Sequence, residues 1–192
     1  APNAGKSTLV KVLGGVVDRD AGALEIGGVP LDNKFGVHTA MKSGLRIVHQ
    51  DQPVVGNLDL GTTVFLGNEQ LGSKRLVSGR ISRQRAQQIM REELGWDMDP
   101  RRLGRTLTPE ERVAVAIAGA LAGGVRALIL DEPTKGVDIG TRASIYAILR
   151  DIVAGGVAVV VVSSDFEELL GLCDQVVVMS DGIVAPVEIP ST

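Results

Sequence analysis

Apolar residues recur along the chain in two patterns, one typical of helices and one typical of strands. Helical spacing of apolar residues follows residue 8 and returns over about 82–94, 109–121, 141–153 and 166–172. Short apolar runs predict strands at 24–26, 45–49, 127–130, 157–162 and 176–179, with the runs at 127–130 and 157–162 reading as buried strands. Because strands alternate with helices, we expect a mainly parallel, three-layer α/β sheet with ligands at the carboxyl ends of its strands.

Capping residues indicate where two of these helices begin. Thr108 followed by Glu111 is a capping box, and Pro109 occupies the first helical position. Ser82 is the expected N-cap of the earlier helix. The block around 68–105 is more polar than its flanks and is predicted to be a small helical subdomain inserted into the α/β core.

Composition narrows the functional classes. The chain has 192 residues, of which 44% are apolar and only 3% aromatic, so aliphatic side chains must build the core. The net charge of −3 gives no reason to expect a nucleic-acid surface. A single cysteine, Cys173, excludes an internal disulfide and a cysteine-based zinc site.

The first eight residues, Ala-Pro-Asn-Ala-Gly-Lys-Ser-Thr, read as the end of a phosphate-binding loop, G-x-x-x-x-G-K-[ST], that opens into a helix. In such a loop, backbone N–H groups and the helix N-terminus attract an anion. Lys6 is predicted to reach the terminal phosphates, and the Ser7 hydroxyl to bind Mg²⁺.

A pair of acidic residues closes the apolar strand at 127–130. A carboxylate at Asp131 is what a phosphate loop needs to complete a Mg²⁺ site. Glu132, next to it, is suited to polarise an attacking water. We therefore expect Lys6 and this acidic pair to converge on one magnesium-bound triphosphate.

At this point several motifs occur together in a recognisable order. They are Asn-Ala-Gly-Lys-Ser-Thr at 3–8, His-Gln at 49–50, Leu-Thr-Pro-Glu-Glu at 107–111, Leu-Ile-Leu-Asp-Glu-Pro-Thr at 128–134 and Gly-Val-Asp at 136–138. This order resembles that of ABC-type ATPases over nearly the whole chain. Segments 135–142 and 162–170 resemble the ATP-binding subunits of bacterial ribose/galactoside/xylose-type sugar importers.

The resemblance implies a P-loop NTPase core forming one ATP-binding domain over 1–192, with a helical subdomain at about 68–105. It implies ATP and Mg²⁺ as ligands, an integral membrane permease and a second ATPase domain as partners, a sugar-binding protein as an indirect partner, and no nucleic acid. It also implies a peripheral position on the cytoplasmic face of the inner membrane. The implied roles are ATP binding by Asn3, Ala4, Gly5, Lys6, Ser7 and Thr8, metal binding by Ser7, Gln50 and Asp131, and catalysis by Glu132 and Gln50.

Three positions depart from the family pattern. The Ser-Gly-Gly-Gln signature is replaced by Thr-Pro-Glu-Glu at 108–111, where Pro109 has no N–H and two carboxylates stand near an expected phosphate. One like-charge pair at ~4 Å costs on the order of 4 kcal/mol at an effective dielectric constant of ~20. Ser164 replaces the switch histidine, and Asn3 stands where glycine is common. The signature helix is therefore predicted to be weak or silent in catalysis.

Three other readings remain open at the level of sequence. A P-loop GTPase is disfavoured because Asn33-Lys34 is followed by Phe35-Gly36 and lacks the guanine-reading aspartate. The other two are an ABC ATPase outside transport and a regulatory half that binds ATP without hydrolysing it. Since family members carry strands ahead of the phosphate loop, we also expect the chain as given to be N-terminally truncated and to bind ATP weakly on its own.

Overall fold

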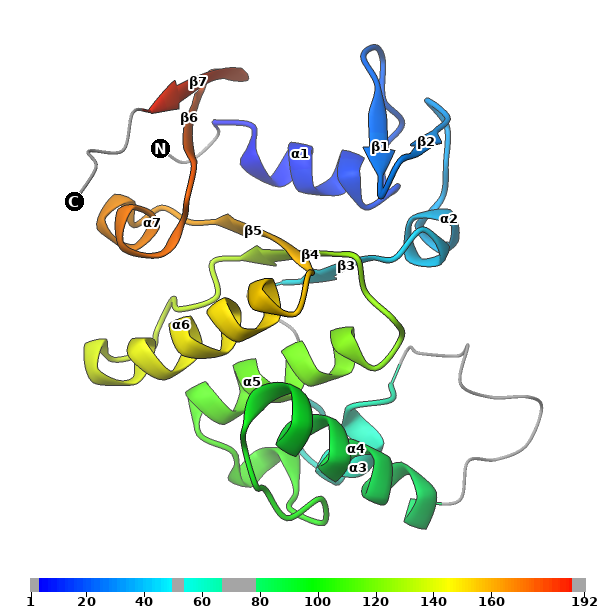
Figure 1. The fold of residues 1–192 in the computed structure, drawn as a ribbon, viewed down its shortest axis with the longest axis vertical. Coiled ribbons are helices and arrows are strands. Elements are labelled where there is room, and N and C mark those ends of the chain that lie inside the picture. Colours follow the sequence, from blue (N-terminus) through cyan, green and yellow to red (C-terminus); the bar gives the residue numbers. More distant parts are fainter. Residues whose placement is uncertain (1–3, 50–53, 67–78, 188–192) are drawn as a thin grey trace.

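A parallel three-stranded sheet lies at the centre of the molecule (Figure 1). The computed structural model describes residues 4–49, 54–66 and 79–187. The sheet has the order β3 (Leu45–Val48), β4 (Ala127–Asp131) and β5 (Ala158–Val162), and both pairings are parallel. The predicted parallel α/β fold is therefore confirmed.

Helices cover both faces of this sheet, which gives three layers (Figure 1). Helix α1 (Lys6–Leu13) lies on one face, and α5 (Pro109–Leu121) and α6 (Ile139–Ala154) lie on the other. The central strand shows why: Leu128 and Leu130 pack with the core around α5 and α6, whereas Ile129 packs with Val10 of α1. Full burial of each such side chain is worth about 1.5–3 kcal/mol.

Two antiparallel hairpins flank α1 (Figure 1). The first joins β1 (Leu24–Ile26) to β2 (Val29–Leu31), and the second joins β6 (Val176–Ser180) to β7 (Ile183–Val187). Each second strand contains a proline: Pro30 pairs with Glu25, and Pro186 pairs with Val177. The predicted strand at 176–179 is thus present, but within the described residues it pairs with β7 and not with the parallel sheet.

A helical block fills the other end of the molecule. It contains α3 (Leu60–Thr63), α4 (Gly79–Leu94), the 3₁₀ turn η2 (Gly104–Thr106) and the first turns of α5. The prediction that Ser82 caps α4 is wrong, because the helix begins at Gly79 and the Ser82 side chain is buried inside it. The limits of 68–105 for a subdomain stay a prediction, since only its part from residue 79 is described.

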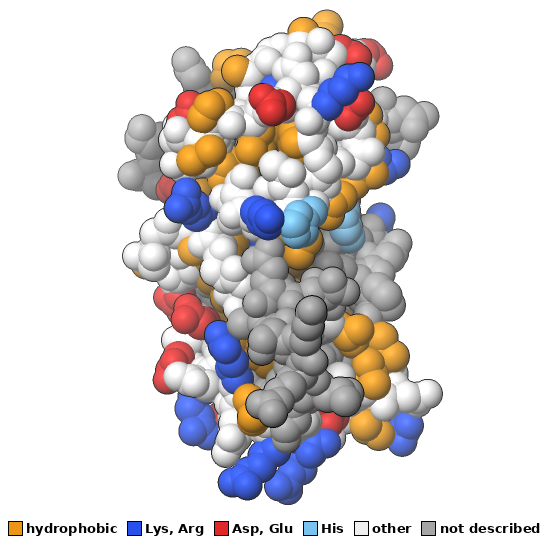
Figure 2. Space-filling model, turned by 90° about the vertical axis from the view of Figure 1, so that its right-hand side faces the viewer, with side chains coloured by type: hydrophobic (Ala, Val, Ile, Leu, Met, Phe, Trp, Pro, Cys, Tyr) orange, Lys and Arg blue, Asp and Glu red, His pale blue; other side chains and the backbone are white. Residues whose placement is uncertain are grey.

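Two short helices complete the chain, α2 (Val37–Lys42) before β3 and α7 (Phe166–Leu172) after β5. None of the helices in the described residues has the length and apolar character that crossing a bilayer requires. Both histidines, His38 and His49, are exposed. Figure 2 shows arginine and lysine side chains gathered at the end of the molecule that the helical block forms.

The expected burial of the strand at 157–162 is only partly right. Its residues are exposed or half-buried, and Val160 of β5 remains 47% exposed. In the described sheet β5 is an edge strand, because it pairs with β4 alone.

Candidate functional site: a loop cation beside an acidic strand end

The chain enters α1 through a backbone conformation that suits glycine. Gly5 is the N-cap of α1 and has φ 93°, a left-handed value that a residue with a side chain rarely adopts. No side chain caps this helix, and its first turn contains no acidic residue. The first turn of α1 therefore adds no negative side chain of its own, as an anion-binding loop requires.

The hairpin β6–β7 contacts the same loop. The backbone N–H of Gly182, in the turn of the hairpin, donates to the carbonyl of Ala4 at 3.2 Å. A side-chain carbon added at Gly5 would lie 3.4 Å from the Met179 methyl group. This packing fixes the buried Ala4 and the glycine that follows it.

The acidic pair lies where β4 ends. Asp131 is the last residue of the strand and pairs with Val162, the last residue of β5. Glu132 follows with φ 53°, one of two non-glycine residues with positive φ among those described, and its N–H donates to the Val162 carbonyl at 2.7 Å. Such a conformation costs of order 1–3 kcal/mol and persists only where neighbours impose it.

Lys6 and Glu132 meet between α1 and the sheet. The Lys6 Nζ lies 3.7 Å from Glu132 Oε1 and donates to the Ser163 carbonyl at 3.3 Å. The Ser164 hydroxyl donates to the other oxygen, Glu132 Oε2, at 3.1 Å. The convergence of the amino-terminal loop with the end of β4 is therefore present, and both side chains are mostly buried.

Two of the predicted metal ligands, Ser7 and Asp131, have oxygen atoms that suit a hard cation. Ser7 offers a hydroxyl on the exposed first turn of α1, and Asp131 offers a half-buried carboxylate. Neither side chain makes a hydrogen bond or ion pair with another described residue, so their oxygens remain available. Mg²⁺ prefers oxygen ligands and keeps several waters, which matches such an open donor set.

The other predicted site residues divide into two groups. Thr8 is exposed on α1, and Ala4 is buried just before it. Asn3 and Gln50 lie outside the described residues. The roles assigned to all of these residues stay predictions.

The helix that begins at the altered signature has a complete capping box, as predicted. The Thr108 hydroxyl accepts from the Glu111 N–H at 3.2 Å, and Glu111 Oε2 accepts from the Thr108 N–H at 2.9 Å. Arg102 adds two hydrogen bonds to the Glu111 carboxylate, at 2.6 and 2.8 Å. These bonds hold the pKa of Glu111 below its ordinary value, with the Arg102 hydrogen bonds as the largest cause.

Arg102 was not anticipated from the sequence and changes the charge argument. It neutralises Glu111, so that only Glu110 remains as an unpaired carboxylate on this turn among the described residues. Two backbone donors of this turn are nevertheless consumed, because the N–H groups of Thr108 and Glu111 are both engaged, and Pro109 has none.

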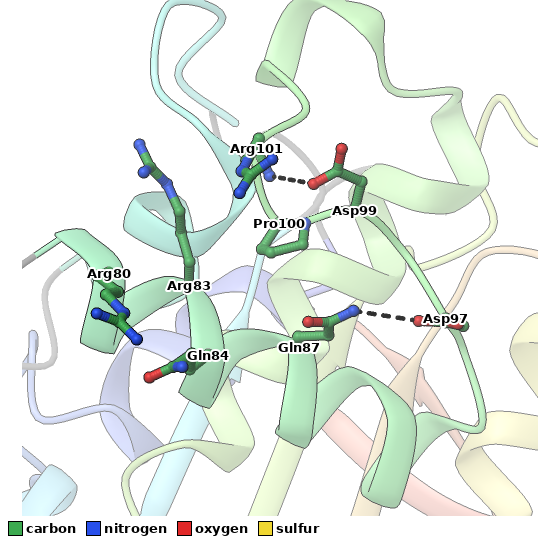
Figure 3. A pocket seen from close by; sticks show the side chains of 8 residues that line it. All are labelled: Arg80, Arg83, Gln84, Gln87, Asp97, Asp99, Pro100 and Arg101. Carbon is green, nitrogen blue, oxygen red and sulfur yellow. Dashed lines mark hydrogen bonds between the residues drawn. The ribbon is translucent and has the colours of Figure 1, made fainter.

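A separate pocket of about 550 Å³ opens on the helical block (Figure 3). Arginines from α4 and from the segment before η2 line it, but Arg83 is paired with Asp59 at 2.6 Å. Asp97 and Asp99 also line it, and Asp99 accepts from the Arg101 N–H. The pocket is lined by side chains of both charges and lies in the helical block, away from α1. It is therefore separate from the Lys6–Glu132 contact (Figures 1 and 3).

Comparison with known proteins identifies the family. The family model described as ABC transporter matches residues 2–135, which is more than half of the chain. The chain belongs to the ABC transporter family. This result confirms the resemblance seen in the motifs and makes the GTPase reading wrong.

Curated members of the ABC transporter family give similar names. The ribose import ATP-binding protein RbsA of Clostridium perfringens is 34% identical over 182 residues, which cover 93% of this chain and 36% of the relative. A putative ribose/galactose/methyl galactoside import ATP-binding protein of Burkholderia cenocepacia is 35% identical over 179 residues, covering 93% of this chain and 35% of the relative. The chain thus spans about a third of the length of these relatives.

Solved structures confirm the fold of this ABC transporter family member. An ATP-binding cassette of an ABC transporter in its ADP conformation matches with a TM-score of 0.80 at 21% identity, covering 96% of this chain and 76% of that one. The cbiO1 protein from Clostridium perfringens, part of the ABC transporter complex cbiONQ, matches with a TM-score of 0.79 at 25% identity, covering 96% and 72%.

Sequence reasoning missed several side chains that shape the site. Ser163 contributes its carbonyl to Lys6, and its hydroxyl donates to Glu168 at 2.6 Å. Thr134, two residues after Glu132, donates to the same carboxylate at 2.5 Å. The available signal was Glu168 itself, an acidic residue three positions after Asp165. Such spacing suggests a helix cap, and it does not reveal that Glu168 contacts distant segments.

Proposed function

We propose that this chain is the ATP-binding and ATP-hydrolysing domain of a subunit that powers a membrane importer for a sugar. The observation that carries the proposal is the contact between Lys6 of the phosphate loop and Glu132 at the end of β4. The names of the relatives, which refer to ribose and galactoside import, support a sugar as the transported substrate.

The side chains divide the work between binding and proton transfer. The N–H groups at the start of α1 and the Lys6 ammonium would bind the phosphates, with Asn3 and Thr8 flanking them. Ser7, Asp131 and Gln50 would hold Mg²⁺, which when bound neutralises charge developing on the phosphates. Glu132, aided by Gln50, would accept the proton of the attacking water.

The ion pair between Lys6 and Glu132 suggests how binding prepares the base. In the structure the ammonium lies 3.7 Å from the carboxylate and partly neutralises it. An incoming phosphate competes for the same ammonium, because it carries more negative charge than one carboxylate. Once Lys6 turns to the phosphate, the Glu132 carboxylate keeps only the Ser164 hydroxyl as a side-chain partner among the described residues, and it is free to accept a proton.

The signature turn supports low activity at the opposing nucleotide. Its Thr108 and Glu111 N–H groups are used within the capping box, and Pro109 offers none. This observation also favours a second function, in which the chain binds ATP as the non-hydrolysing, regulatory half of a two-site dimer. An ABC ATPase outside transport is the other alternative, and the names of the relatives speak against it.

The same proposal names the partners and the location. A second ATPase domain would complete the nucleotide sites, an integral membrane permease would receive the motion, and a sugar-binding protein would deliver the substrate to that permease. The chain would then lie peripherally on the cytoplasmic face of the inner membrane.

Phosphate release by the protein as its gene encodes it, reconstituted with its permease, tests the proposal. Lys6→Met should abolish Mg²⁺-dependent ATP hydrolysis, whereas Lys11→Met, an exposed lysine later in the same helix, should leave it unchanged. Equal rates in the two variants would contradict the proposal, and so would a preference for GTP over ATP.

A further inference from the structure

A buried carboxylate that the proposed mechanism does not use connects three parts of the chain. Glu168 of α7 is only 6% exposed. Its Oε1 accepts from the Thr134 hydroxyl at 2.5 Å and from the Tyr146 hydroxyl at 3.3 Å, and its Oε2 accepts from the Ser163 hydroxyl at 2.6 Å. We call these four residues the Glu168 network.

Burying the Glu168 carboxylate costs free energy that a purely packing role would not require. A buried carboxylate costs several kcal/mol unless hydrogen bonds compensate, and an apolar side chain would pack at lower cost. Both oxygens have donors here, but all three donors are neutral hydroxyls. The nearby Arg142 guanidinium instead pairs with Asp165 at 2.8 Å.

The network holds the two segments that surround Glu132. Thr134 lies two residues after Glu132, and it is 2% exposed. Ser163 directly precedes Ser164, and its carbonyl accepts from Lys6. One carboxylate thus ties the turn after β4 to the segment after β5, and these two segments carry Glu132 and its partner Ser164.

We propose that Glu168 is a positioning residue for ATP hydrolysis, which orients Glu132 by holding these two segments together. The positive φ of Glu132 needs such support, since a residue with a side chain relaxes from it unless neighbours prevent this. A displacement of ~1 Å at a catalytic group can lower the rate by about 10²-fold. This inference rests on the proposed function.

Isosteric loss of one hydroxyl gives the sharpest test. In the protein as its gene encodes it, with its permease, Thr134→Val should lower kcat for ATP about tenfold and leave KM unchanged, because the loop that binds ATP is untouched. Thr134→Ser, which restores the hydroxyl, should regain most of kcat. Thr63→Val is the matched control, because its hydroxyl bonds to the Asp59 carbonyl in the helical block, and its kcat should equal that of the unmodified protein.

Changes at Glu168 itself give the second test. Glu168→Leu should lower kcat about 100-fold at constant KM, and Glu168→Gln should regain most of it, since an amide can still accept from Thr134 and donate to Ser163. Unchanged kcat in Thr134→Val, or equal loss in Glu168→Gln and Glu168→Leu, would overturn the inference. If Glu168→Leu does not fold, the threonine pair decides.

Hydrogen exchange separates failure of this inference from failure of the proposed function. If the unmodified protein hydrolyses no ATP, the proposed function fails. In that case the amide of Glu132, bonded to the Val162 carbonyl, still reports on positioning. Faster exchange of this amide in Thr134→Val but not in Thr63→Val supports the inference, and equal exchange overturns it.

Discussion

Removing the Glu111 side chain should destabilise the protein, because this residue serves two partners at once. Its carboxylate closes the capping box of α5 and also receives two hydrogen bonds from Arg102. Glu110, its neighbour in the same turn, makes neither contact with a described residue. The pair Glu111→Ala and Glu110→Ala therefore separates the capping contacts from a general effect of acidic charge.

The magnitude follows from these contacts. Loss of the bond to the Thr108 N–H is worth about 0.5–1.5 kcal/mol. Two charge-assisted bonds to Arg102 add about 1 kcal/mol, at the low end because the Arg102 side chain is 34% exposed and solvent screens it. We expect Glu111→Ala to lower the free energy of unfolding by about 2 kcal/mol and Glu110→Ala by less than about 0.5 kcal/mol.

The effect should depend on pH in a defined direction. Hydrogen bonding to Arg102 lowers the pKa of Glu111 from an ordinary value of 4.5. A carboxyl group with a depressed folded-state pKa stabilises the fold above its unfolded pKa, and this contribution is lost as the pH falls through the folded value. The gap between the unmodified protein and Glu111→Ala should be full at pH 7 and should shrink in acid below pH ~4.

Urea unfolding at pH 7 and in acid below pH ~4 measures both the loss of unfolding free energy and its dependence on pH. Midpoints that shift equally in Glu111→Ala and Glu110→Ala would refute the reasoning about the capping box. A gap that stays constant on acidification would refute the part assigned to Arg102.

Three further predictions concern the nucleotide site and the packing. Ser164→His should raise the rate of ATP hydrolysis, because an imidazole beside Glu132 reaches further than a hydroxyl. Phosphate release measures this rate, and no rise with ATP binding intact would contradict a role of position 164 in hydrolysis. Gly61→Ala should destabilise by roughly 1–3 kcal/mol, since its new methyl group would lie 2.7 Å from the Arg83 backbone, whereas Gly171→Ala, with open space around it in α7, should be neutral or slightly stabilising in thermal unfolding. Arg46→Met should destabilise by about 2 kcal/mol in urea unfolding, because this buried guanidinium donates to three backbone carbonyls; an unchanged midpoint would show that those carbonyls find other donors.

Local signals predicted the elements that are strongly patterned. The start of α5 was predicted residue by residue, because a capping box and a proline at the first position act within one turn. The central strand β4 was equally clear, because it is apolar on both faces. The sequence around 37–42 gave no such signal for α2, where Ala40 is the one buried residue.

The errors come from tertiary contacts that overrule local patterns. Ser82 resembles a cap but lies buried within α4, packed in the helical block. The strands β2 and β7 were missed, since each contains a proline.

The candidate site shows the same division. Lys6 and the acidic pair could be predicted because the chemistry of phosphate binding demands those residue types in a fixed order. Glu168 could not, because its contact with Thr134 joins residues 34 positions apart and no periodic pattern records it. Arg102 was hidden for a similar reason, since it lies nine positions before Glu111 with a 3₁₀ turn between them.

The two prolines of the hairpins have a consequence for the behaviour of this protein in concentrated solution. Pro30 and Pro186 stand in β2 and β7, strands that pair on one side only within the described structure. A strand with a free side can recruit a strand from another molecule, and a residue without an N–H interrupts that ladder. Along its second strand, each hairpin therefore carries its own barrier to growth into an intermolecular sheet, even though Ile183 and Val184 of β7 are exposed.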